Sequence, residues 1–127
     1  FSVQREKRQI DLIWDLDQEP LICEFDLQQM EQATINILKN ALEAIGEQGR
    51  ISIKTSNNPQ KLLSIRDSGS GFSESDRSNL FTPFFSTKKN GQGVGLMMIR
   101  DILMNHGFGF SLQRIDPQTT EFLIELK

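Results

Sequence analysis

The chain has a single cysteine, a small net charge and no long apolar run, and each shortage excludes a class of protein. Because Cys23 is the only cysteine, the fold has no internal disulfide, and a reducing compartment is expected. No apolar stretch is long enough to cross a bilayer, and the N-terminus lacks a signal-peptide pattern. A net charge of −3 gives no basic footprint for nucleic acid. We therefore expect neither nucleic-acid binding nor direct membrane contact.

What is present is the composition of an ordinary globular domain. Hydrophobic residues make up 37% and charged residues 24% of the 127 positions. A chain of this size folds around one core and buries about two-thirds of its unfolded surface. With no internal repeat and no break in composition, residues 1–127 are expected to form a single domain. The missing start methionine and the charged opening VQREKR suggest a fragment of a longer chain.

The periodicity of apolar residues predicts a mixture of strands and helices. Helices are expected at 27–48 and 94–106, and strands at 9–16, 21–25, 51–56, 61–67, 109–114 and 120–127. Most strands form sequence-adjacent pairs, and the helices are too few to cover both faces of a sheet. This favours an α+β fold, a two-layer α/β sandwich whose mixed, mainly antiparallel sheet packs on helices. The polar residues 68–92 are expected to be a long irregular binding loop.

Three segments carry residues suited to binding a phosphorylated ligand. Asn36 and Asn40 lie one turn apart along the edge of the first helix, where amide oxygens suit Mg²⁺, although a solvated polar face explains them equally well. Asp67 ends the apolar face of a strand and is followed by glycine. It is either a carboxylate that accepts a hydrogen bond from a planar base or a simple turn residue. The glycine-rich GQGVGL at 91–96 enters a helix, where backbone N–H groups favour an anion, or it is a flexible linker.

Taken in order, these segments resemble the characteristic boxes of sensor histidine kinases. QATINILKNALEAI is similar to the N box, DSGSG to the G1 box, LFTPFFSTK to the F box and GQGVGL to the G2 box. The resemblance covers 27–126 and implies the catalytic ATP-binding domain of a histidine kinase. Such a domain has the Bergerat fold that is shared with gyrase-type topoisomerases and heat-shock chaperone ATPases. The FFSTK lid and Glu43 resemble the short-lid, nitrogen-regulatory type.

The resemblance also implies which residues bind the nucleotide. Asn40 and Asn36 would hold Mg²⁺ and phosphate, Asp67 would accept from the adenine amino group, and Lys88 would be the cation of a lid at about 72–92. Asn36, Asn40 and Lys88 would serve catalysis. The full set implied is Asn36, Asn40, Asp67, Gly69, Gly71, Lys88, Gly91, Gly93, Gly95, Leu96 and Thr120.

The implied activity is transfer of the γ-phosphate of ATP to a histidine on a separate dimerisation domain, expected before residue 1. Partners would be that domain and the receiver domain of a response regulator, in the cytoplasm. ATP-hydrolysing branches of the superfamily carry a glutamate base where this chain has Asn36, and an amide cannot accept a proton. His106 resembles a structural histidine, so the isolated fragment is expected to bind nucleotide without autophosphorylating. The alternative is a non-catalytic nucleotide-sensing or protein-binding module of the same fold.

Overall fold

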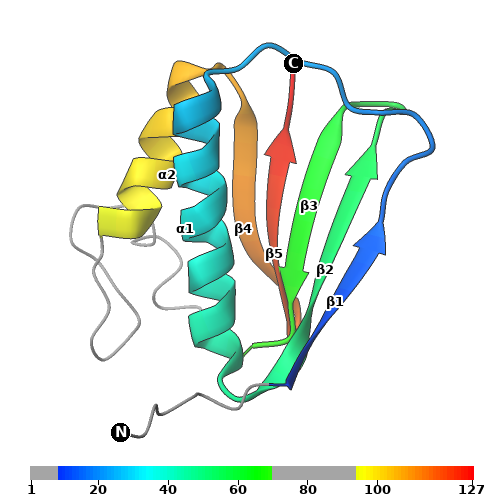
Figure 1. Ribbon diagram of the computed structural model, residues 1–127, viewed down its shortest axis with the longest axis vertical. Coiled ribbons are helices and arrows are strands. Elements are labelled where there is room, and N and C mark those ends of the chain that lie inside the picture. Colours follow the sequence, from blue (N-terminus) through cyan, green and yellow to red (C-terminus); the bar gives the residue numbers. More distant parts are fainter. Residues whose placement is uncertain (1–8, 70–93) are drawn as a thin grey trace, which may run out of the picture.

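The computed structural model describes residues 9–69 and 94–127, and Figure 1 shows their arrangement. The predicted lid at about 72–92 lies outside the described residues. Within them, a layer of two helices packs against one five-stranded sheet. The elements in chain order are β1 (Gln9–Asp15), α1 (Leu27–Ile45), β2 (Gln48–Ser56), β3 (Leu62–Asp67), α2 (Val94–Asn105), β4 (Gly109–Asp116) and β5 (Thr119–Glu125).

The sheet is mixed and mainly antiparallel, as the sequence predicts. Its strand order is β1-β2-β3-β5-β4. The hairpins β2–β3 and β4–β5 and the pair β3–β5 are antiparallel, whereas β1 runs parallel to β2. A parallel pair needs a crossover connection, and here α1 supplies it between β1 and β2. The predicted two-layer α/β sandwich is thus confirmed.

The strand predicted at 21–25 is wrong, because this segment pairs with no strand of the described sheet. It belongs to the crossover that connects the end of β1 to the start of α1 along one end of the sheet (Figure 1). The carbonyl of Ile22 accepts a hydrogen bond from Lys61 Nζ at 2.6 Å. Alternating apolar residues indicated an extended backbone here, but the segment crosses the end of the sheet and pairs with no described strand.

Helix α1 begins as predicted and ends earlier than predicted. The Asp26 carboxylate caps it by accepting a hydrogen bond from the Gln29 N–H at 2.9 Å. The helix stops at Ile45, because Gly46 has a φ of 81° and Gln48 already belongs to β2. The predicted end at 48 therefore overran the helix into the next strand. Among the described helices, none is both long and apolar enough to span a membrane.

The core lies between the helices and the sheet. Each element contributes apolar side chains at its own period, from every third or fourth residue of a helix and every second residue of a strand. The residues buried in this cluster are Met30, Ala33, Ile37, Ala41, Ile51, Ile65, Ile99, Ile102, Leu103, Phe108, Phe122 and Ile124.

The C-terminus of α2 is closed by backbone hydrogen bonds around Gly107. Phe108 N–H donates to the Leu103 carbonyl, and Gly107 N–H donates to the Met104 carbonyl, both at 3.0 Å. This is a Schellman motif, in which the residue after the helix adopts a left-handed conformation; Gly107 has a φ of 71°. The motif turns the chain directly into β4.

Candidate functional site

The two asparagines lie on the side of α1 that faces α2. Both are half-buried, next to the fully buried Ile37 and Ala41, so they line the edge of the apolar face as the periodicity predicts. Asn36 Nδ2 donates to Met98 Sδ at 3.2 Å, which joins α1 to the start of α2. Local sequence patterns do not predict this contact, because the two residues lie on different helices.

Asp67 closes β3 with its carboxylate on the helix-facing side of the sheet. Asp67 is only 9% exposed, and its Oδ1 accepts a hydrogen bond from the Gly69 N–H at 2.9 Å. Burial raises the pKa of this carboxyl above its ordinary value, and the Gly69 hydrogen bond only partly opposes that effect. A second carboxylate oxygen remains available to a hydrogen-bond donor.

The backbone after Asp67 lies directly against α1. A Cβ on Gly69 would be 2.6 Å from the Ala44 carbonyl carbon, closer than atoms of this kind approach one another. Ser68 holds the same turn against β2, since its Oγ accepts from the Arg50 N–H at 2.9 Å. Small residues on both sides therefore permit this contact, and the sequence indicated the room beside Ala44 without identifying what fills it.

Thr120 lies directly across from Asp67 in the pairing of β5 with β3. Thr120 is 6% exposed, and its Oγ1 is buried with no hydrogen-bond partner among the described residues. A buried hydroxyl normally has a partner, and leaving one unpaired costs about 1–3 kcal/mol. A carboxylate and a hydroxyl with no partner among the described residues thus lie side by side on the helix-facing side of the sheet, and Arg114 of β4 pairs with Thr120 on its other side.

These polar groups are aligned along α1. The turn after Asp67 meets the helix at Ala44, and Asn40 and Asn36 follow at one-turn intervals toward the contact with Met98. Eight residues of helix correspond to a rise of about 12 Å. The arrangement places the turn after the Asp67 carboxylate at one end of this line and the two amide side chains toward the other.

Helix α2 contributes the last predicted residues that the structure describes. Gly95 lies in its first turn with open space where a side chain would point. Leu96 is half-buried and packs against the core. The remaining members of the predicted set, Gly71, Lys88, Gly91 and Gly93, lie outside the described residues.

His106 has both ring nitrogens engaged within the fold. Nδ1 lies 2.7 Å from the Ile102 carbonyl, and Nε2 accepts a hydrogen bond from the Asp26 N–H at 3.0 Å. These two bonds fit a neutral ring with its proton on Nδ1. The side chain therefore connects the end of α2 to the start of α1, which agrees with the structural role predicted for it.

Curated relatives of the chain are sensor kinases. Sensor histidine kinase ZraS of Salmonella typhimurium is 31% identical over 98% of this chain and 27% of its own length. Sporulation kinase E of Bacillus subtilis is 37% identical over 98% of this chain and 17% of its own length. The chain thus spans about a quarter or less of these two relatives.

Solved structures agree with this relationship. The catalytic domain of histidine kinase ThkA superposes with a TM-score of 0.80 and 33% identity, over 92% of this chain and 78% of that one. The mycobacterial sensor histidine kinase MprB gives a TM-score of 0.81 and 25% identity, over 92% and 80%. The family model of histidine kinase-, DNA gyrase B- and HSP90-like ATPases matches residues 25–127. The chain therefore belongs to this ATPase family, as an ATP-binding domain of the type found in sensor histidine kinases.

Proposed function

We propose that this domain binds ATP with Mg²⁺ and presents the γ-phosphate to a histidine on a separate dimerisation domain of a two-component sensor kinase. The observation that carries the proposal is the polar pair on the apolar sheet face, the buried Asp67 carboxylate and the unpaired Thr120 hydroxyl. Burial of both groups costs stability unless hydrogen-bond partners compensate for it.

An adenine ring fits the chemistry of this pair. The free oxygen of Asp67 accepts the N–H of the exocyclic amine, and the Thr120 hydroxyl gains a partner on the same base or through a water molecule. Gly69 supports the recognition because its N–H orients the carboxylate. Apolar neighbours in the core then exclude water from the faces of the ring, which strengthens each hydrogen bond.

The amides of α1 fit a hydrated magnesium ion and phosphate oxygens. Mg²⁺ prefers oxygen ligands and keeps several waters, so in nucleotide sites it binds through few side chains together with the phosphates. Asn40 and Asn36 provide such neutral ligands on one helix face, about one turn apart. Predicted phosphate contacts from Lys88, Gly91 and Gly93 complete the proposed site, beside Gly95 and Leu96 of α2. Gly71 is predicted to shape the pocket around the base together with Gly69.

Asn36 favours phosphoryl transfer over ATP hydrolysis by the domain alone. An amide has no basic lone pair with which to activate water, and here its nitrogen also donates to Met98. The domain then contributes positioning and charge stabilisation, and the acceptor histidine comes from elsewhere. The proposed partners are accordingly the dimerisation domain and the receiver domain of a response regulator, and the proposed location is the cytoplasm.

Titration calorimetry with ATP, in the presence and absence of Mg²⁺, tests the proposal. We expect binding in both conditions and tighter binding with Mg²⁺. Asn40→Ala should remove most of the Mg²⁺-dependent gain while leaving the metal-free affinity nearly unchanged. Lys39→Ala, on the exposed neighbouring position, is the matched control and should leave both isotherms unchanged.

Two results would contradict the proposal. Absence of binding at millimolar ATP would rule out a nucleotide site and favour a protein-binding module of the same fold. An unchanged Mg²⁺ dependence in Asn40→Ala would remove that residue from the metal site, whatever the affinity for ATP.

A further inference from the structure

Exposed apolar side chains are concentrated in one part of the chain. Within residues 9–69 and 94–127, eight of the eleven exposed large hydrophobic residues come from positions 12–35. They lie on β1, on the crossover 16–26 and on the first half of α1. The eight are Leu12, Ile13, Trp14, Leu16, Ile22, Phe25, Leu27 and Ile35. Such a concentration is typical of a binding surface rather than of scattered surface residues.

Part of this surface is hollowed. A groove of about 640 Å³ runs between the crossover and α1, with Phe25, Leu27 and Ile35 on its walls and Leu63 of β3 in its floor. Each of those three wall residues is about half exposed or more, so the groove is open to solvent.

The helix-facing side of β1 adds two further exposed apolar residues to this surface. In the pairing of β1 with β2, Leu12 lies across from Ile51 and Trp14 across from Ile53. Because the side chain of Ile51 is buried in the core, Trp14 and Leu12 also face the helical side of the sheet. They are nevertheless 61% and 56% exposed, because β1 is the edge strand farthest from both helices (Figure 1). We call the groove together with Leu12 and Trp14 the β1 trough.

The dimensions of the β1 trough suit an α-helix. Helix α1 packs on β2 and β3, and α2 on β4, so the helical layer stops short of β1. From β3 to β1 the sheet extends by two strand spacings, about 10 Å. That is close to the diameter of one helix with its side chains and to the separation of two packed helices. A helix beside α1 would complete the layer.

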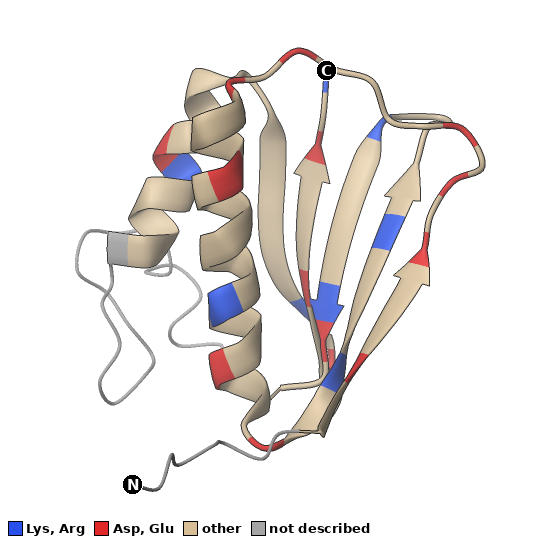
Figure 2. Ribbon diagram, viewed as in Figure 1, with Lys and Arg blue, Asp and Glu red and all other residues tan. Residues whose placement is uncertain are grey.

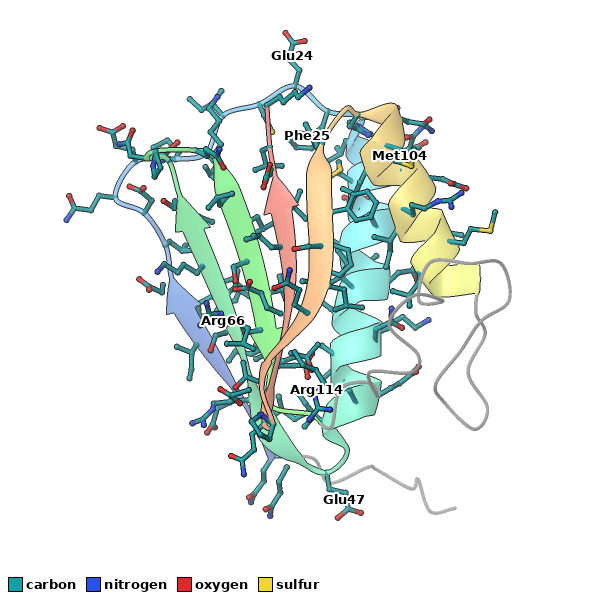
Figure 3. All side chains as sticks on the ribbon, turned by 180° about the vertical axis from the view of Figure 1, so that it is seen from behind. Glu24, Phe25, Glu47, Arg66, Met104 and Arg114 are labelled. Carbon is teal, nitrogen blue, oxygen red and sulfur yellow. The ribbon has the colours of Figure 1, made fainter. Side chains whose placement is uncertain are left out.

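The charge around the β1 trough is negative. Residues 16–38, which form the crossover and the first part of α1, carry five carboxylates and no lysine or arginine. Asp11 and Asp15 alternate with Leu12 and Trp14 and therefore lie on the other face of β1. Figure 2 shows acidic positions along β1, the crossover and the start of α1, and Figure 3 shows Glu24 directed away from the molecule at the end of the sheet. Glu31 lines the groove itself. Cations of other described elements also approach: Lys61 donates to the Ile22 carbonyl, and Arg50 and Lys54 of β2 lie across from Asp11 and Asp15.

The negative charge around the β1 trough disfavours two possible occupants, a second copy of the chain and an anionic lipid surface. A second copy that paired antiparallel along β1 about Ile13 would oppose Asp11 and Asp15 of each copy, which is unfavourable. An anionic lipid surface would be repelled for the same reason. We propose that the β1 trough docks a cationic amphipathic helix of a protein partner, with its apolar stripe on Trp14 and Ile35 and its lysines or arginines near Glu31 and Glu24.

Trp14 is the only tryptophan in the chain, so its fluorescence reports occupation of the trough directly. The probe is an 18-residue helical peptide with leucines at i, i+3, i+4 and i+7 and flanking lysines. We expect a saturable blue shift of the Trp14 emission and binding at least tenfold tighter than that of the same peptide with glutamates in place of the lysines.

Substitutions at exposed positions separate docking from loss of folding. Ile35→Ser and Glu31→Lys should each weaken the lysine peptide at least fivefold, since both residues line the groove. Met104→Ser is the matched control, because Met104 is 61% exposed on α2, outside the trough, and should not change the affinity. Circular dichroism should show all three variants folded.

Four results would overturn the proposal. These are the absence of a shift with the lysine peptide, equal affinity for the two peptides, equal weakening by Met104→Ser, and a blue shift caused by anionic vesicles instead. Sedimentation equilibrium provides a further test: a dimer that protects Trp14 would assign the β1 trough to a second copy of the chain.

Discussion

Asp67 is a buried carboxylate whose burial opposes stability and which we propose recognises the adenine base. Burial raises its pKa, so the folded state keeps the proton to a higher pH than the unfolded chain does. Stability contributed by the protonated form is therefore present at low pH and is lost as the pH rises through the folded-state pKa. At neutral pH the ionised carboxylate lowers the free energy of unfolding in the absence of ligand.

The substitution Asp67→Asn separates these two effects. At pH 7 we expect the ligand-free variant to unfold at a higher urea concentration than the parent. The difference should shrink as the pH falls through the raised folded-state pKa and reach its minimum near pH 4, the ordinary carboxyl pKa. ATP binding should weaken about 10- to 100-fold, which corresponds to the loss of one hydrogen bond to a charged acceptor. Urea titrations across pH and calorimetry measure the two quantities.

The exposed Asp11 provides the control for that experiment. Asp11→Asn should leave both the pH dependence and the ATP affinity unchanged. If Asp67→Asn were instead less stable than the parent at neutral pH, the carboxylate would be a structural group and the pairing with an adenine amine would lose its main support.

At the level of elements, His106 connects the two helices that form one layer. Its two hydrogen bonds reach the Ile102 carbonyl within α2 and the Asp26 N–H at the start of α1. Each bond contributes about 0.5–1.5 kcal/mol. We therefore expect His106→Ala to lower the free energy of unfolding by about 1–3 kcal/mol, measured by urea denaturation.

Asn105→Ala, at the exposed neighbouring position, tests whether the effect is specific to this link. It should change the free energy of unfolding by no more than about 0.5 kcal/mol, as is usual for surface substitutions. An equal loss in both variants would mean that the end of α2 is generally sensitive and that the His106 link contributes little.

The elements were largely predictable, and the exceptions have a common physical cause. Periodicity located both helices and five strands, because each buries one face at its own period. It failed at 21–25, where apolar alternation is real but the backbone has no strand to pair with. Whether an extended segment becomes a strand depends on its neighbours, which local sequence does not specify.

The site was also only partly predictable from local sequence, because some of its contacts depend on the whole fold. The candidates Asn36, Asn40 and Asp67 were identified from local patterns and family resemblance, and the structure brings the turn after Asp67 against α1. Two features required the assembled fold. Thr120 becomes a neighbour of Asp67 only through the pairing of β3 with β5, and Met98 meets Asn36 only through the packing of α1 on α2.

The last prediction concerns the proposal that this domain binds ATP and a separate domain carries the acceptor histidine. If the domain positions ATP and a separate domain carries the acceptor, the chain alone should bind labelled ATP without becoming phosphorylated. His106, with both ring nitrogens engaged in the fold, is no acceptor. Adding a separately produced dimerisation domain of the same kinase should yield acid-labile phosphohistidine on that domain.

Two controls make this transfer assay decisive. Asn40→Ala should lower the transfer rate at least tenfold if Asn40 holds the metal, whereas Lys39→Ala should not affect it. Replacing the acceptor histidine of the dimerisation domain should abolish labelling completely. Label on the chain alone, or steady ATP hydrolysis without a partner, would contradict the proposal, because Asn36 provides no base with which to activate water.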